Sequence, residues 1–174
     1  MPRMPYFDLS RADEQLRAAV GTRPPLNIYR MLAHGGPAAV GFLELGAALL
    51  RKNELDSRLR ELAILRVGIL CRAEYEVYQH ERLARRVGVA EEKIQALRDG
   101  PDAPAFDTLE RKVLRYTDQV VLNVKAGDST FKAVADSLSQ RALMELTITI
   151  GYYMMVSRVL ENFEVEIEPA PQQA

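Results

Sequence analysis

The stretch AEYEVYQHERLARRV, residues 73–87, decides the fold, because its apolar side chains fall on one face of a helix. At about 100° per residue they form a stripe of roughly 120°. Charged and polar side chains fill the opposite face. The pattern therefore predicts an amphipathic helix with one buried face, made of Ala73, Glu76, Val77, His80, Leu83, Ala84 and Val87.

Two ionisable side chains, Glu76 and His80, lie four positions apart on this apolar face. Burying charge is costly unless it is paired, so we expect these groups to contact each other, other polar groups or a pocket. A carboxylate beside a histidine stabilises the imidazolium and orients its ring, as in a general base or proton shuttle. The pair could equally be a satisfied contact at a helix or subunit interface.

The rest of the chain also follows a helical period, and alternating β-branched runs are almost absent. We expect an all-α fold and one domain over residues 1–174, because no long linker divides the chain. An N-terminal helical segment occupies residues 1–37, and residues 166–174 form a loose tail. Caps and turn residues predict helices over about 12–20, 27–33, 37–52, 57–72, 73–87, 90–99, 108–125, 128–136 and 139–163.

Composition excludes several classes of function. A formal net charge of −1 gives no case for nucleic acid or acidic lipid partners. With one cysteine, Cys71, and two histidines, the chain has no disulfide framework, no multi-cysteine metal site and no histidine cage. The first residues lack a signal-peptide pattern and no apolar run is long enough to span a bilayer, so we expect a soluble cytoplasmic protein.

The helix that precedes residues 73–87 is apolar on most sides, which predicts that it is enclosed. Its first turns contain Glu61, which is either part of the site or an acid favoured by the helix dipole. Cys71 is either a buried small hydrophobe or a reactive thiol. The apolar excess of this helix and of residues 139–163 predicts self-association into a homo-oligomer.

These motifs together resemble the carboxymuconolactone decarboxylase and alkylhydroperoxidase D-like superfamily over about residues 38–163. Glu61 and His80 are 19 positions apart, as in that family. The other motifs that carry the resemblance are Arg58-Leu-Arg-Glu61-Leu-Ala-Ile-Leu-Arg66, Glu74-Tyr75-Glu76, Ala84, Gly88-Val89-Ala90-Glu91-Glu92-Lys93-Ile94 and Gly151-Tyr-Tyr-Met-Met-Val-Ser-Arg158. The resemblance implies an oligomeric, all-helical bundle of the alkylhydroperoxidase D type.

The two branches of this family imply different chemistry. The hydroperoxidase branch has the pattern Glu-x11-Cys-x2-Cys-x3-His, whose cysteine positions here are Ala73 and Glu76. A dithiol cycle needs both thiols, and Cys71 alone cannot supply them. The decarboxylase branch has Glu-x3-His, as in Glu76 and His80, and the resemblance implies proton transfer on a small carboxylated lactone without a metal or organic cofactor.

The sequence therefore predicts a site built from Glu61, Glu76 and His80, with acid–base chemistry on a small organic acid or lactone. His80 is the expected proton shuttle, Glu76 its partner or the base, and Glu61 the orienting carboxylate. Tyr75, Arg66 and Arg72 are candidates for binding the substrate. The alternatives are a hydroperoxidase that uses Cys71 and a non-catalytic binding or scaffold protein.

Overall fold

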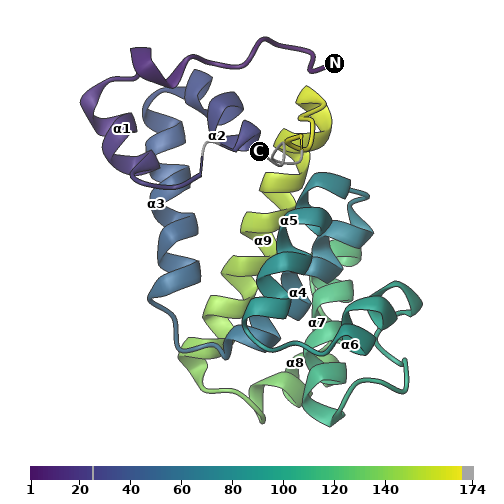
Figure 1. Cartoon of the computed structure of the whole chain (residues 1–174). Coiled ribbons are helices and arrows are strands. Elements are labelled where there is room, and N and C mark those ends of the chain that lie inside the picture. Colours follow the sequence, from purple (N-terminus) through teal and green to yellow (C-terminus); the bar gives the residue numbers. More distant parts are fainter. Residues whose placement is uncertain (25, 170–174) are drawn as a thin grey trace.

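The computed structural model describes residues 1–24 and 26–169, and in these ranges it contains α- and 3₁₀-helices and no strand (Figure 1). No helix of this part of the chain is long and apolar enough to cross a membrane. The all-α prediction is confirmed. The α-helices are α1 (Glu14–Val20), α2 (Asn27–Leu32), α3 (Pro37–Arg51), α4 (Ser57–Leu70), α5 (Glu74–Arg86), α6 (Glu91–Ala96), α7 (Thr108–Asn123), α8 (Asp128–Ala135) and α9 (Gln140–Phe163).

Local capping explains where several helices begin. Asp56 accepts hydrogen bonds from the first backbone amides of α4, and Ser139 caps α9 in the same way. Asp107 and Glu110 form the capping box that the sequence predicts for α7. Helix α8 begins at Asp128, as the predicted range does, but its N-cap is Gly127 rather than the aspartate expected to cap it.

Helix α4 is the centre of the bundle and packs against α5, α7 and α9 (Figure 1). Its residues from Leu59 to Gly68 are all buried, which confirms the predicted enclosure. Arg66 is buried as well, because its guanidinium makes a two-pronged ion pair with Asp118 of α7 at 2.6 and 2.8 Å. It also donates to the Leu97 carbonyl, so it ties three elements together.

A tight turn joins α4 to α5 and makes the two helices antiparallel neighbours. Arg72 takes a left-handed conformation there, with φ of 57°. Beyond the turn, Gly68 brings α5 close, since a Cβ at Gly68 would lie 3.1 Å from the Val77 side chain. Glu61 and His80 lie at similar distances from this turn along their helices, so their side chains meet across the interface between α4 and α5.

Helix α1 packs on α3, and α2 and α3 contact α9 outside the main bundle (Figure 1). Helix α2 is held by the distant segment 165–169. The Glu168 carboxylate accepts from the first backbone amide of α2, at Asn27, and from the Tyr75 hydroxyl, while the Asn27 side chain donates to the Glu166 carbonyl. Of the tail expected to be loose, residues 166–169 are thus bonded, and residues 170–174 lie outside the described residues.

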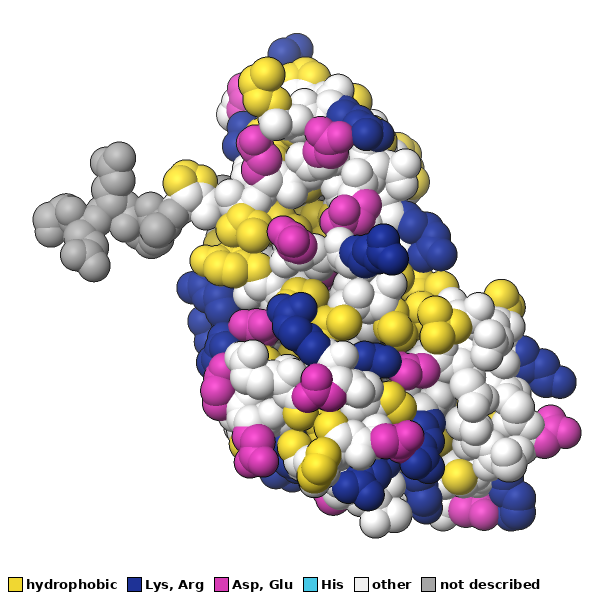
Figure 2. Space-filling view, turned by 90° about the vertical axis from the view of Figure 1, so that its right-hand side faces the viewer, with side chains coloured by type: hydrophobic (Ala, Val, Ile, Leu, Met, Phe, Trp, Pro, Cys, Tyr) yellow, Lys and Arg dark blue, Asp and Glu magenta, His cyan; other side chains and the backbone are white. Residues whose placement is uncertain are grey.

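The surface mixes charge and apolar groups. The face in Figure 2 carries acidic and basic side chains of both signs between hydrophobic ones. Four large apolar side chains of α9, Met144, Ile148, Met155 and Phe163, are exposed, as is Leu45 of α3.

The contact between α3 and α9 depends on a missing side chain at Gly46. A Cβ there would overlap the Tyr152 phenol, whereas the exposed Gly41 of the same helix has open space around it. We expect Gly46→Ala to lower the free energy of unfolding by about 1–3 kcal/mol through overpacking. The matched change Gly41→Ala should raise it by about 1 kcal/mol, because alanine favours helix. Denaturant unfolding measures both, and equal effects would contradict the packing of Tyr152 on Gly46.

Candidate functional site

The candidate site lies in a cavity of about 480 Å³ between α2, α3, α5 and α9. Glu76 and His80 of α5 line it together with Tyr75. Most of the remaining wall is apolar, which is typical of pockets for small organic molecules. The apolar wall residues are Pro24, Leu26, Ile28, Leu32, Phe42, Leu43, Ala47, Leu50, Leu83 and Val156.

His80 lies between two carboxylates. Its Nδ1 is 2.7 Å from Oε2 of Glu61, which reaches across from α4. Its Nε2 is 3.0 Å from Oε1 of Glu76, the expected contact one turn away on α5. That second contact is an ion pair and not a hydrogen bond. Oε1 of Glu76 is buried and has no hydrogen-bond partner among the described residues. The imidazole is thus held firmly on one side and loosely on the other.

Arg60 completes the charge balance of this cluster. Its Nε and Nη2 both donate to Oε1 of Glu61 at 3.1 Å, so both oxygens of Glu61 are occupied. Arg60, Glu61, Glu76 and His80 are all at most 6% exposed. Two carboxylates face one guanidinium and one imidazolium, so the buried cluster is neutral when His80 is protonated, which is the condition for burying it at tolerable cost.

The electrostatics favour that protonated form. Burial lowers the pKa of His80, but the Glu76 charge, the hydrogen bond to Glu61 and the Glu61 charge outweigh it and raise the pKa to about 10. The Tyr153 ring stands edge-on to the imidazole at a centroid distance of 4.9 Å. Burial and the nearby Glu76 and Glu61 charges hold the pKa of the Tyr153 hydroxyl well above its usual value. At neutral pH the site therefore presents an imidazolium beside the Glu76 side chain.

The other candidates from sequence lie in different places. Tyr75 is buried and lines the cavity, although its position on the helix predicted that it projects away from the stripe centre. Its hydroxyl donates to Glu168 at 2.6 Å, which fixes it as part of the wall. Arg66 is occupied by Asp118, and Arg72 is exposed in the turn. Neither lines the cavity, and nor does Cys71, which packs at the edge of the main core.

Sequence reasoning missed Arg60 and Tyr153 as parts of the site. Arg60 directly precedes Glu61 at the start of an apolar helix, and that adjacent charged pair was the available signal. Tyr153 was interpreted as core, which it also is. Within the described residues, no group of three or more His, Cys, Asp or Glu side chains has the arrangement of a metal site.

Residues 37–119 match the carboxymuconolactone decarboxylase family. No curated protein matches the chain at a significant level. Several solved structures share the fold. An alkylhydroperoxidase AhpD core protein from Ralstonia eutropha, an uncharacterised peroxidase-related protein, has a TM-score of 0.80 at 15% identity, covering 96% of this chain and 92% of its own.

Two further structures have the same fold at low identity. An AhpD-type protein of unknown function from Agrobacterium tumefaciens has a TM-score of 0.72 at 21% identity, covering 77% of this chain and 92% of its own. A cysteine-to-alanine variant of the debrominase Bmp8, in complex with 2,3,4-tribromopyrrole, has a TM-score of 0.72 at 19% identity, covering 94% and 87%. The predicted alkylhydroperoxidase D-like fold is thereby confirmed.

The raised pKa of His80 predicts a pH dependence of stability. An ordinary histidine titrates near pH 6.5 when unfolded. The protonated ring stabilises the fold fully below that pH, and the contribution is lost as pH rises towards about 10. The free energy of unfolding should therefore fall between these pH values, and His80→Gln should flatten this part of the profile. Ring resonances of His80, assigned by their loss in His80→Gln, should still report the imidazolium at pH 8. A neutral ring at that pH would contradict the charge balance.

Proposed function

We propose that this chain is an enzyme that carries out acid–base chemistry without a cofactor. Its residues 37–119 match the carboxymuconolactone decarboxylase family, and its fold is alkylhydroperoxidase D-like. Its substrate is a small organic acid or lactone, and its reaction is proton transfer or decarboxylation. The observation that carries the proposal is the buried Oε1 of Glu76, which has no hydrogen-bond partner among the described residues and lies in a cavity wall beside a charged imidazole.

Glu76 is the proposed base. Its Oε1 has no hydrogen-bond partner among the described residues, and Glu76 lines the cavity, so this oxygen is available to a substrate C–H bond. When it removes a proton from a carbon next to a carbonyl, the electron pair of the C–H bond forms a carbon–carbon double bond and the π pair of the carbonyl moves onto its oxygen, giving an enolate. The proton then resides on Glu76.

His80 is the proposed proton shuttle. Its Nε2 lies 3.0 Å from Glu76, so a proton can pass between the two groups with little movement. In a decarboxylation the C–C bond to the carboxylate breaks and carbon dioxide leaves. The electron pair left on carbon then takes a proton from Glu76 or His80. Glu61, held by Arg60, fixes the ring through Nδ1 and stabilises its positive charge.

A thiol peroxidase is the alternative from the same family. The two thiol positions of the hydroperoxidase pattern hold Ala73 and Glu76. Cys71 lines neither the cavity nor the space beside His80. A non-catalytic scaffold is the alternative from another class, and it requires the buried cluster to serve stability alone.

The proposal predicts that a small set of acids or lactones exchanges carbon-bound hydrogen for solvent deuterium, or releases carbon dioxide, in the presence of the protein. Glu76→Gln and His80→Gln should slow that reaction by about 10²- to 10⁴-fold, because each removes a proton-transfer group. Glu74→Gln changes an exposed carboxylate of the same helix and is the matched control. A metabolite screen followed by NMR and mass spectrometry measures this. If the wild-type protein acts on nothing in the screen, the scaffold alternative is favoured.

Peroxide consumption with a dithiol reductant should be near background. The reason is that one thiol, Cys71, cannot be both the attacking and the resolving group. Cys71→Ser should leave the rate unchanged. Robust turnover that disappears in this variant would establish the peroxidase instead.

We also propose that the chain is a homo-oligomer. The exposed Met144, Ile148 and Met155 follow one face of α9, and a contiguous apolar face of this kind is usually covered by a partner. Light scattering at micromolar concentration should give a multiple of the chain mass. A monomer would contradict the proposal.

A further inference from the structure

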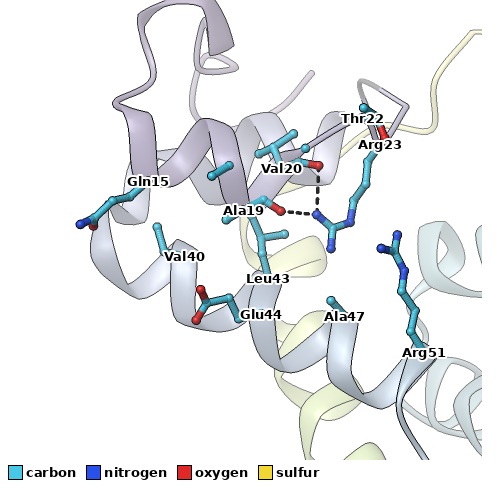
Figure 3. A pocket seen from close by; sticks show the side chains of 12 residues that line it. Gln15, Ala19, Val20, Thr22, Arg23, Val40, Leu43, Glu44, Ala47 and Arg51 are labelled. Atoms are coloured by element: carbon cyan, nitrogen blue, oxygen red, sulfur yellow. Dashed lines mark hydrogen bonds between the residues drawn. The ribbon is translucent and has the colours of Figure 1, made fainter.

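The cavity that contains Glu76 and His80 adjoins a second hollow. This outer cavity, of about 830 Å³, lies between α1 and α3 (Figure 3). The two cavities share four lining residues, Arg23, Leu43, Ala47 and Arg51. These residues therefore mark the junction through which one space continues into the other.

Two arginines face each other at this junction (Figure 3). One guanidinium nitrogen of Arg23 donates to the carbonyls of Ala19 and Val20 at the end of α1, which anchors the side chain. The Arg51 side chain has no hydrogen bond or ion pair to any described residue. The Arg23 side chain has no ion pair to any described residue. Glu44 lines the outer cavity too, but Figure 3 shows its carboxylate directed away from the arginines.

Two facing cations without a counter-charge repel each other, and an anion between them would remove that repulsion. A guanidinium presents several donors in a planar fork that matches a carboxylate. Because Arg23 is already held by backbone carbonyls, little freedom is lost when its remaining donors bind a ligand. The junction has the chemistry of a carboxylate site.

The charge along the inner cavity is also unequal. Arg23 and Arg51 are at the junction, while the Glu76 carboxylate is deeply buried at the His80 site. Arg82 and Arg86 of α5 line the inner cavity as well and add positive charge on exposed positions. The Arg23 guanidinium lies 5.9 Å from the Tyr29 ring, another wall residue. A carboxylate in the cavity is repelled by Glu76 and attracted by the arginines, so it has a preferred orientation.

We propose that Arg23 and Arg51 bind the carboxylate of an organic acid whose apolar body occupies the inner cavity and whose other end reaches Glu76 and His80. This orientation rests on the proposed function for the reaction, but the binding is measurable without turnover. Arg23 lies outside the family-matched residues 37–119, so the N-terminal segment supplies half of the carboxylate site. Arg23 and Arg51 are positioning residues that select the substrate class.

The test compares 4-phenylbutyrate with its neutral amide, 4-phenylbutyramide, by isothermal titration calorimetry. The wild-type protein should bind the acid in preference to the amide. Arg51→Gln should weaken binding of the acid by about tenfold, as expected for loss of one charge-assisted hydrogen bond, and leave binding of the amide unchanged. Arg23→Gln should act in the same direction, with circular dichroism to confirm that α1 remains folded. Arg17→Gln is the matched control, because Arg17 is exposed on α1 and lines neither cavity.

The proposal is overturned if the wild-type protein binds neither probe saturably, if acid and amide bind equally, or if Arg51→Gln affects both equally. The proposal is also overturned if the control variant Arg17→Gln binds the acid as weakly as Arg51→Gln does. Glu76→Gln should keep the preference for the acid. Charge-selective binding that depends on Arg51, in a protein that turns over no acid, supports this site and counts against the proposed reaction. Turnover that depends on Glu76, with acid binding indifferent to Arg51, supports the reaction and counts against this site.

Discussion

The contact between Glu61 and His80 is the interaction on which the rest of the site depends. It crosses from α4 to α5 at the centre of the bundle, where both side chains are buried. A buried imidazolium is stable only while its two carboxylates remain in place, and Glu61 remains in place only because Arg60 occupies its other oxygen. The bundle must therefore hold α4 and α5 in one register, and Gly68 allows the close approach that this needs.

The helices could be predicted because their signals are local. Asp56, Asp107 and Ser139 each cap the helix that follows them, and the apolar stripe of residues 73–87 marks the buried side of α5. Glu76 and His80 belong to the same stripe, so their proximity follows from helix geometry alone.

The rest of the site depends on contacts between elements, which no local pattern specifies. The spacing of Glu61 and His80 suggested a pair, but its distance is set by the turn at Arg72. Arg66 was a candidate for binding the substrate, but its partner Asp118 lies 52 positions away in the sequence and occupies its guanidinium. Tyr75 is turned inward by its bond to Glu168, and that carboxylate belongs to a segment whose composition suggests a tail. Tertiary partners override the helical stripe in each of these cases.

The bonds between α2 and the segment 165–169 also have a consequence for the order of folding. The backbone amide of Asn27 and its acceptor Glu168 are 141 positions apart, and the Glu166 backbone amide donates to the Tyr6 hydroxyl 160 positions away. Contacts this distant in sequence form late, because a long loop must close first. The contact between Glu61 and His80 spans only 19 positions and closes a much shorter loop. We therefore expect the acid–base cluster to form before the segment 165–169 fixes α2 as a wall of the cavity.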